Sequence, residues 1–178
     1  MSFGPEHPNV ASDLNNLASL FQATKRLSGA ELLMRRVLSI DESNFGPGHP
    51  NVAIDLNNLA ALLLVMKRSS EAEPLMRRAL SIDEASFGSE HPDIARDLNN
   101  LSRLLRDTNR MSEAEPLIRR ALSIFFDFTR QTGHEHPNLP VVFDNYCVLL
   151  REMGKAESEI EAELQELMHG SGPVPAGL

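Results

Sequence analysis

Residues 3–18 read FGPEHPNVASDLNNLA, and this stretch decides the fold because the chain contains it three times. It returns as FGPGHPNVAIDLNNLA at residues 45–60 and as FGSEHPDIARDLNNLS at residues 87–102. The period is 42 residues, and a fourth, more divergent copy starts near His136, 45 residues after His91. A fixed period of this size indicates an array of stacked structural repeats rather than one globular core.

The period divides the chain into four units and a tail. The predicted units are residues 3–44, 45–86, 87–131 and 132–169. The third unit has a longer second helix or loop, and the fourth is a divergent terminal repeat. The tail, residues 170–178, is rich in glycine and proline, and we expect it to be disordered.

Each unit is predicted to contain two helices. The first begins at a His-Pro pair, since proline suits the first helical turn, and an apolar stripe follows it at helical spacing. The second begins with Ser-x-x-Glu, as at Ser28 and Glu31, and the same pattern recurs from Ser70 and from Ser112. This pattern is typical of a capping box, in which the two side chains satisfy free backbone N–H groups of the first turn.

The fourth unit can be aligned with the others through Ser158 and Glu161, which repeat the Ser-x-x-Glu pattern. This alignment places one extra residue in the turn between its two helices. Ile160 and Leu167 then stand where earlier units have small alanines, and the opposite face is rich in glutamate. Such a composition is expected of a terminal helix that has no further neighbour.

Small residues such as Ala18 recur where two helices must approach closely. With HPxVAxxLNNLA in the first helix and EAExLxRRALSI in the second, the pattern resembles the tetratricopeptide repeat. The 42-residue period is similar to the subclass found in kinesin light chains and many bacterial arrays. The resemblance implies an all-α fold, a right-handed superhelical solenoid of about four antiparallel helix pairs. The family's glycine between the helices stands only at Gly154, and we expect the turns that carry Lys25, Lys67 and Asn109 to be less sharply fixed.

The resemblance also implies that the first helices line a concave face on which family members bind extended peptides. The candidate groove residues on that face are Asn16, Ile54, Asn58, Leu64, Arg96, Asn100, Arg103, Arg106, Asn145 and Arg151. Asparagine both donates and accepts hydrogen bonds and can hold a peptide backbone. Arginine suits carboxylates. The predicted ligand is therefore an extended, acidic peptide segment with an apolar anchor.

Two alternative interpretations remain open at this point. Arg96 and Arg106 have acidic neighbours, so they could form ion pairs within the chain, and the asparagines could bond one another between repeats. Phe125 and Phe126 form either extra core or an exposed patch for self-association. In the second case the chain is a structural or regulatory segment with an empty groove. It would dock through its ends or the Phe125–Phe128 patch, and a second copy of the chain is a possible partner.

Composition narrows the function classes. The net charge of −8 disfavours nucleic-acid binding, and no apolar run of about 18 residues predicts a membrane span. The single cysteine, Cys147, fits a reducing compartment, so we expect a cytoplasmic protein. His7, His49, His91 and His136 each precede a helix-start proline, which disfavours a metal site at His134 and His136. No catalytic motif is present, so we expect a protein or peptide partner and no enzyme activity, cofactor or metal.

Overall fold

The computed structural model describes Gly4 and residues 6–169, and these residues form eight helices without a strand. The chain divides into two compact units, Met1–Ser89 and Glu90–Leu178. Unit 1 contains α1 (Pro8–Ala23), α2 (Leu27–Phe45), α3 (Pro50–Val65) and α4 (Ser69–Phe87). Unit 2 contains α5 (Pro92–Asp107), α6 (Met111–Thr132), α7 (Leu139–Glu152) and α8 (Glu157–His169). None of the described helices combines the length and the apolar character that crossing a membrane requires.

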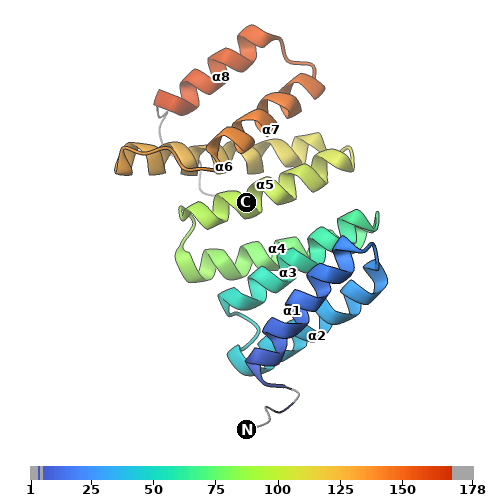
Figure 1. The fold of residues 1–178 in the computed structure, drawn as a ribbon. Coiled ribbons are helices and arrows are strands. Elements are labelled where there is room, and N and C mark those ends of the chain that lie inside the picture. The colour runs from blue at the N-terminus through green and yellow to red at the C-terminus, as the bar shows by residue number, and fades with distance from the viewer. Residues whose placement is uncertain (1–3, 5, 170–178) are drawn as a thin grey trace. The chain divides into compact units, whose positions relative to one another are not determined.

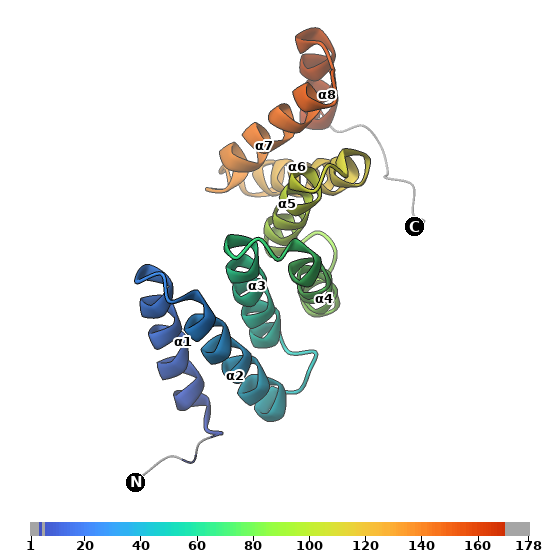
Figure 2. The same cartoon turned by 90° about the vertical axis from the view of Figure 1, so that its right-hand side faces the viewer.

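Consecutive helices form pairs, which confirms the predicted all-α architecture. In unit 1, α1 packs on α2, α3 packs on α4, and α2 packs on α3 to join the two pairs (Figures 1 and 2). In unit 2, α6 packs on α5 and α7, and α8 contacts both α6 and α7. Alanines make these close approaches possible, since Ala18, Ala30, Ala60 and Ala72 are completely buried.

In the His-Pro pairs the histidine contributes to the helix start as well as the proline. His7, His49 and His91 are the N-cap residues, and proline follows each one. The Nδ1 atom of each imidazole accepts a hydrogen bond from the backbone N–H two residues later, at 3.1, 3.1 and 3.3 Å. His136 accepts the same bond from Asn138 at 3.2 Å, although α7 begins only at Leu139. His7, His49 and His91 therefore cap the helices that follow them. In the fourth unit the predicted His-Pro start is wrong, because α7 begins after the N-cap Asn138.

The predicted capping boxes at the second helices are wrong. α2 begins at Leu27, so Ser28 is already inside the helix and is not its N-cap. The N-cap is Arg26, and its side chain makes no hydrogen bond to the free N–H groups of the first turn. α4 and α6 begin in the same way after Arg68 and Arg110. The physical reason is the preceding turn, which fixes the start of the helix through the backbone and leaves the serine too late in the turn to cap it.

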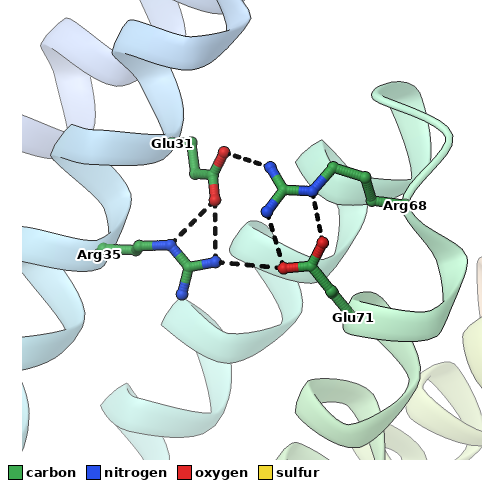
Figure 3. Close-up of polar contacts among 4 residues, drawn as sticks. All are labelled: Glu31, Arg35, Arg68 and Glu71. Atoms are coloured by element: carbon green, nitrogen blue, oxygen red, sulfur yellow. Dashed lines mark hydrogen bonds and ion pairs between the residues drawn. The ribbon is translucent and has the colours of Figure 1, made fainter.

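Glu31, expected in a capping box, instead belongs to a network of four charged side chains (Figure 3). One carboxylate oxygen lies 2.8 Å from Arg35 Nη2 on the same helix, and the other lies 2.5 Å from Arg68 Nη1 at the start of α4. Arg68 in turn binds Glu71, with Nε 2.6 Å from Oε1. The hydrogen bond from Arg68 is the main cause that lowers the pKa of Glu31. The network links α2 to α4 within unit 1, at a partly exposed position where ion pairs contribute modestly.

All four turns between paired helices have one conformation, although only one contains glycine. Lys25, Lys67 and Asn109 have φ of 57°, 63° and 61°, and Gly154 has φ of 85°. In each turn the same three backbone hydrogen bonds form, as in the bonds from Met66, Lys67 and Arg68 to Leu62, Leu64 and Leu63. The expectation of looser turns at the lysines is therefore not met in the backbone, and the lysines carry the strain of a left-handed conformation.

The fourth pair confirms the predicted insertion. The N–H of Lys155 bonds to Leu150 as that of Arg110 bonds to Leu105, which is a shift of 45 residues. The N–H of Ile160 bonds to Ala156 as that of Ala114 bonds to Arg110, which is a shift of 46. One extra residue therefore lies between these two bonds. Ile160 is buried where earlier units have alanine.

The interpretation of Phe125 and Phe126 as an exposed self-association patch is wrong. Their exposed fractions are 0% and 8%. Phe125 occupies a position that is buried in the first two repeats as well, since its counterparts Asp41 and Asp83 are buried. The ring of Phe125 stacks on His136 with centroids 4.4 Å apart, and Phe128 meets His136 edge-on at 5.3 Å. Both rings therefore contact the histidine that precedes α7. The predicted tail, 170–178, lies outside the described residues.

We predict that Lys67→Gly raises the free energy of unfolding by about 0.5–1 kcal/mol. It removes left-handed strain of about 1–2 kcal/mol but gives the unfolded chain more freedom. Urea unfolding measures the gain. The reverse substitution, Gly154→Lys, is the control, because that position has φ of 85° and open space for a side chain. It should destabilise the protein, and two changes of the same sign would contradict the strain argument.

We also predict that unit 2 loses stability as the pH falls from 7.5 to 5.5. Burial, partly offset by Asp93, lowers the pKa of His136 below its ordinary value of 6.5. In this pH range the unfolded chain then binds more protons than the folded chain, so acid favours unfolding. Tyr146 is the only tyrosine and tryptophan is absent, so tyrosine fluorescence reports unit 2. The substitution His136→Asn should reduce the pH dependence of this transition, and an unchanged slope would contradict the prediction.

Candidate functional site

A hollow of about 380 Å³ opens between α1 and α3 in unit 1. Its lining residues come from α1, α2 and α3, and they are Asn15, Asn16, Ser19, Gln22, Met34, Asn58, Ala61, Leu62 and Val65. The α1 and α3 residues follow one another at helical spacing, so each helix presents one stripe to the hollow. The walls combine neutral amide and hydroxyl groups with apolar side chains, and this volume lies in the range of small-ligand and side-chain pockets.

The structure brings some predicted groove residues together and leaves others apart. Asn16 and Asn58 face the same hollow from two neighbouring first helices. The predicted apolar residues Ile54 and Leu64 do not line it. Ile54 is about half exposed outside the hollow, and Val65 takes the place expected for Leu64.

Sequence reasoning missed Met34, which lies on a second helix and contributes to the wall of the hollow. The amide of Gln22 donates to its sulfur over 3.7 Å, so the two residues close one side. A signal was present, because Met34 recurs as Met76 at the equivalent position of the next repeat. It was overlooked because only first helices were expected to line the groove.

The equivalent place in unit 2 is filled. There Arg103 and Arg106 stand where unit 1 has Ser19 and Gln22. The surrounding side chains leave no room for a water molecule, and they are Ser102, Arg103, Arg106, Ile118, Asn145 and Leu149. Long guanidinium side chains thus replace the small polar residues that keep the hollow of unit 1 open.

The candidate arginines differ in whether a carboxylate already binds them. Arg96 lies 3.5 Å from Asp93 and Asp97, which supports the alternative of pairing within the chain. Arg106 likewise lies 3.2 Å from Asp107 and 3.8 Å from Glu152. Arg151 binds both carboxylate oxygens of Glu157, at 2.6 and 3.0 Å.

Arg103 is exposed and has no carboxylate partner among the described residues. It is therefore the candidate arginine that is available to an external anion.

The asparagines also divide into two groups. Asn145 donates from Nδ2 to Oδ1 of Asn99 at 2.9 Å, so it joins α7 to α5. Asn15 bonds to the buried carboxyl of Asp55 and joins α1 to α3. Asn16 and Asn58 are exposed, and Asn100 is half-buried. Part of the asparagine set therefore bonds between repeats, while Asn16 and Asn58 present their amides to the hollow.

A pair of carboxyl groups is buried at the junction of α2 and α3. Asp41 and Asp55 are both buried, and they are hydrogen-bonded to each other. Burial, reinforced by the charge of Asp41, raises the pKa of Asp55 to about 7, while the bond from Asn15 opposes this change. Burial also raises the pKa of Asp41. A proton shared by the two groups removes the cost of two buried charges.

No three histidine, cysteine, aspartate or glutamate side chains gather at a possible metal site in the part of the chain that the structure describes. His134 and His136 flank Glu135, but the imidazole of His136 already accepts a hydrogen bond from the N–H of Asn138 and contacts two phenylalanine rings. The chemistry that the site offers is accordingly that of hydrogen bonding, apolar contact and charge pairing.

Comparisons with known proteins agree with this arrangement. A family model described as the tetratricopeptide repeat matches residues 33–85 and 52–125, and a second model of that description matches residues 10–51. A search of curated proteins gives no match.

Solved structures share the fold. Nearly identical TPR-like repeats of a protein assigned as a kinesin light chain from Podosopora anserina match with a TM-score of 0.74 and 21% identity, covering 94% of this chain and 78% of that one. BtubC (BKLC) from P. vanneervenii matches with a TM-score of 0.75 and 24% identity, covering 97% and 70%. Aspartyl phosphate phosphatase F from Bacillus subtilis matches with a TM-score of 0.73 and 16% identity, covering 91% and 40%.

We predict that unit 1 loses stability as the pH rises from 4 to 8. Because the folded chain holds a proton on Asp55 up to a pKa of about 7, and the unfolded chain releases it near 3.8, the stabilisation is lost as the pH rises. Asp55→Asn should flatten this dependence, as measured by hydrogen exchange of α3 amides. The matched control is Asp13→Asn, the same change at the exposed equivalent position in α1. Equal pH profiles for the wild type and Asp55→Asn would refute the shared proton.

Proposed function

Because the chain belongs to the tetratricopeptide repeat family, whose members are protein-interaction scaffolds, we propose that it binds an extended, acidic peptide segment with an apolar anchor. The proposal is carried by one observation, the contrast between equivalent places in the two units. Unit 1 keeps a neutral hollow open, whereas unit 2 fills that place with arginines, of which Arg103 has no carboxylate partner among the described residues.

The hollow of unit 1 suits an apolar side chain of the ligand. Met34, Ala61, Leu62 and Val65 supply apolar surface, and burial of such surface contributes about 25 cal/mol per Å². The neutral amides around them are of the kind that bonds to a peptide backbone without selecting its side chains. No charged side chain lines this hollow among the described residues, which disfavours a charged residue at that point of the ligand.

Arg103 of unit 2 suits a carboxylate of the ligand. Its guanidinium offers a fork of donors that matches a carboxylate, and no internal pair has to be broken before it binds. The protein has a net charge of −8, which would repel an acidic peptide at long range. At physiological ionic strength this repulsion is screened beyond about 8 Å, so a local contact with Arg103 decides the interaction.

The alternative is that the chain docks through an end of its array and leaves the hollow empty. The segment Phe125–Phe128 no longer supports that alternative through its first two phenylalanines, since Phe125 and Phe126 are buried. The exposed side chains of Leu17 and Leu20 favour docking through α1. They lie on a different face of this helix from the residues that line the hollow.

A selection from a random peptide library on the whole chain tests the proposal. We expect enriched peptides to share acidic residues next to one apolar residue. Arg103→Glu should weaken their binding about 10- to 100-fold, because a charge-assisted hydrogen bond of about 1.5–3 kcal/mol is lost. Ser19→Arg combined with Gln22→Arg should also weaken binding, because it introduces into the hollow the residues that fill its counterpart in unit 2.

The matched control is Lys67→Glu, which changes the net charge equally at an exposed turn outside the hollow. It should leave peptide affinity within about twofold. Peptides that bind Arg103→Glu as well as the wild type would overturn the acidic ligand, and a selection without enrichment would favour docking through an end.

A further inference from the structure

The junction between α2 and α3 shows which groups join one repeat to the next. Leu38 of α2 packs on the core cluster that contains Val52 and Leu56 of α3. Met34 meets Leu62 at the wall of the hollow. These contacts come from one face of α2 and bury one face of α3.

Two polar contacts complete this junction. Glu31 of α2 binds Arg68, with Oε2 2.5 Å from Nη1, and Asp41 of α2 shares a buried hydrogen bond with Asp55. Four of the α2 residues at this junction are spaced at i, i+3, i+7 and i+10, and they are Glu31, Met34, Leu38 and Asp41. That spacing places them on a single stripe of the helix. Arg35 and Glu42 of α2 also reach the next repeat, through ion pairs with Glu71 and Arg78.

α1 carries counterparts of the α3 residues that lie at or beside this junction. Val10, Asp13, Leu17 and Leu20 are the counterparts of Val52, Asp55, Leu59 and Leu62, and Arg26 is the counterpart of Arg68. The set therefore contains three apolar residues, one carboxyl and one cation in the order that α3 and its following turn use to bind α2.

In α1 the part of this face around Leu17 and Leu20 is open to solvent, whereas Val10 is half-buried against the cluster of Ala11, Val37 and Ile40. Leu20 is 58% exposed, whereas Leu62 in α3 and Leu149 in α7 are 2% and 1% exposed. Leu17 is 39% exposed, whereas its counterpart Leu59 is completely buried. Asp13 is exposed, and the guanidinium of Arg26 lies over the ring of Phe21 at 3.8 Å rather than in an ion pair with a glutamate. Arg36, the counterpart of Arg78, is bound by Glu6 and adds nothing to this face.

We propose that this face of α1 is a docking surface for one helix of the α2 type, with Glu, an apolar residue, Leu and Asp at i, i+3, i+7 and i+10. Leu20, Leu17 and Val10 pack against its apolar residues, Arg26 binds its glutamate, and Asp13 meets its aspartate as Asp55 meets Asp41. The occupant is thus a repeat of the same kind that a partner protein presents. The proposal does not depend on a ligand in the hollow.

The α8 helix of a second copy fits this face less well. In the register set by its first-turn hydrogen bonds, α8 offers Glu161, Leu164 and Met168 at the first three positions, and it ends at His169, before the fourth. Two of the α2 arginines, Arg35 and Arg36, correspond there to Gln165 and Glu166. A complete stripe with its closing aspartate is found in α2 and recurs in α4, which is why the occupant is a helix of their kind.

A fusion that adds one helix of the α2 type to the whole chain tests the proposal. Residues 27–44 are placed directly before Phe3, so that the junction reproduces the natural sequence from Leu27 to Pro50 except at one loop position. Linkage raises the effective concentration of the helix to about the millimolar range. Every chain carries Leu20→Cys as a reporter and Cys147→Ala to remove the native thiol, and alanine is the residue found at the position of Cys147 in the first two repeats.

We expect the reaction of the reporter thiol at position 20 with a maleimide to slow at least tenfold in the fusion, compared with the chain that has no added helix. The control fusion carries Met34→Glu and Leu38→Glu in the added copy only, and it should react at the unfused rate. Equal rates in the two fusions would overturn the proposal. Circular dichroism confirms that each chain is folded, and a second pair of fusions with the wild-type Leu20 should show a higher Tm for the intact helix than for its control.

Light scattering of the unfused wild-type chain distinguishes a separate α2-type partner from α8 of a second copy. A monomer over the accessible concentration range supports a separate α2-type partner. A concentration-dependent assembly that Leu20→Glu and Met168→Glu both abolish would assign the face to α8 of a second copy and overturn the occupant proposed above.

Discussion

A helix pair of this repeat can bury only part of its apolar surface, so each second helix must be covered by the first helix of the next pair. In unit 1 this constraint is met by Leu38, which packs on the cluster around Val52 and Leu56. Isolated pairs cannot supply that contact, and repeat proteins therefore gain stability from junctions between neighbours. The alanines let the two helices of each pair approach closely. The carboxyl pair of Asp41 and Asp55 and the network around Arg68 join one pair to the next.

The same constraint explains why the candidate site is a neutral hollow in unit 1 and is filled by arginines in unit 2. Packing residues have to recur because every junction uses them, whereas the exposed residues of the first helices are free to change. Ser19 and Gln22 leave a hollow in unit 1, and their counterparts Arg103 and Arg106 fill the equivalent place in unit 2. Two repeats with almost the same backbone thus present different chemistry. Binding preferences can be altered in this architecture without altering the fold.

Much of the fold was predictable from the sequence, because a threefold repeat averages out the ambiguity of any single segment. The helix pairs, the histidine-proline starts of α1, α3 and α5 and the extra residue before α8 all follow from comparing equivalent positions. The errors arose where a local motif competes with its surroundings. Ser28 resembles a capping residue, but the left-handed turn at Lys25 starts the helix before it. Phe125 and Phe126 resemble an exposed patch, but Phe125 occupies a position that is buried in each of the first three repeats, where the aspartates of the first two hide this from the sequence.

The candidate site was less predictable for a related reason. Whether an arginine is available depends on the distance to a carboxylate, which spacing along a helix indicates only for neighbours. Asp93 and Asp97 signalled the pairing of Arg96, whereas the partner of Arg151 lies across a turn at Glu157. The contribution of Met34 to the hollow required the relative position of two helices, and no single-helix pattern contains that information.

The buried carboxyl pair also bears on how the chain finds its correct order during folding. α2 and α4 carry the same joining stripe, and α3 and α5 carry the same receiving residues, so a second helix could be covered by the first helix of a wrong repeat. At the last junction Phe125 and Val142, both buried, replace the two aspartates. A first helix bearing Asp55 or Asp97 would have to place a carboxyl against Phe125 without its acidic partner, at a cost of several kcal/mol. The exchange of aspartate for phenylalanine therefore makes the packing of α6 against a first helix from another repeat less favourable than its packing against α7.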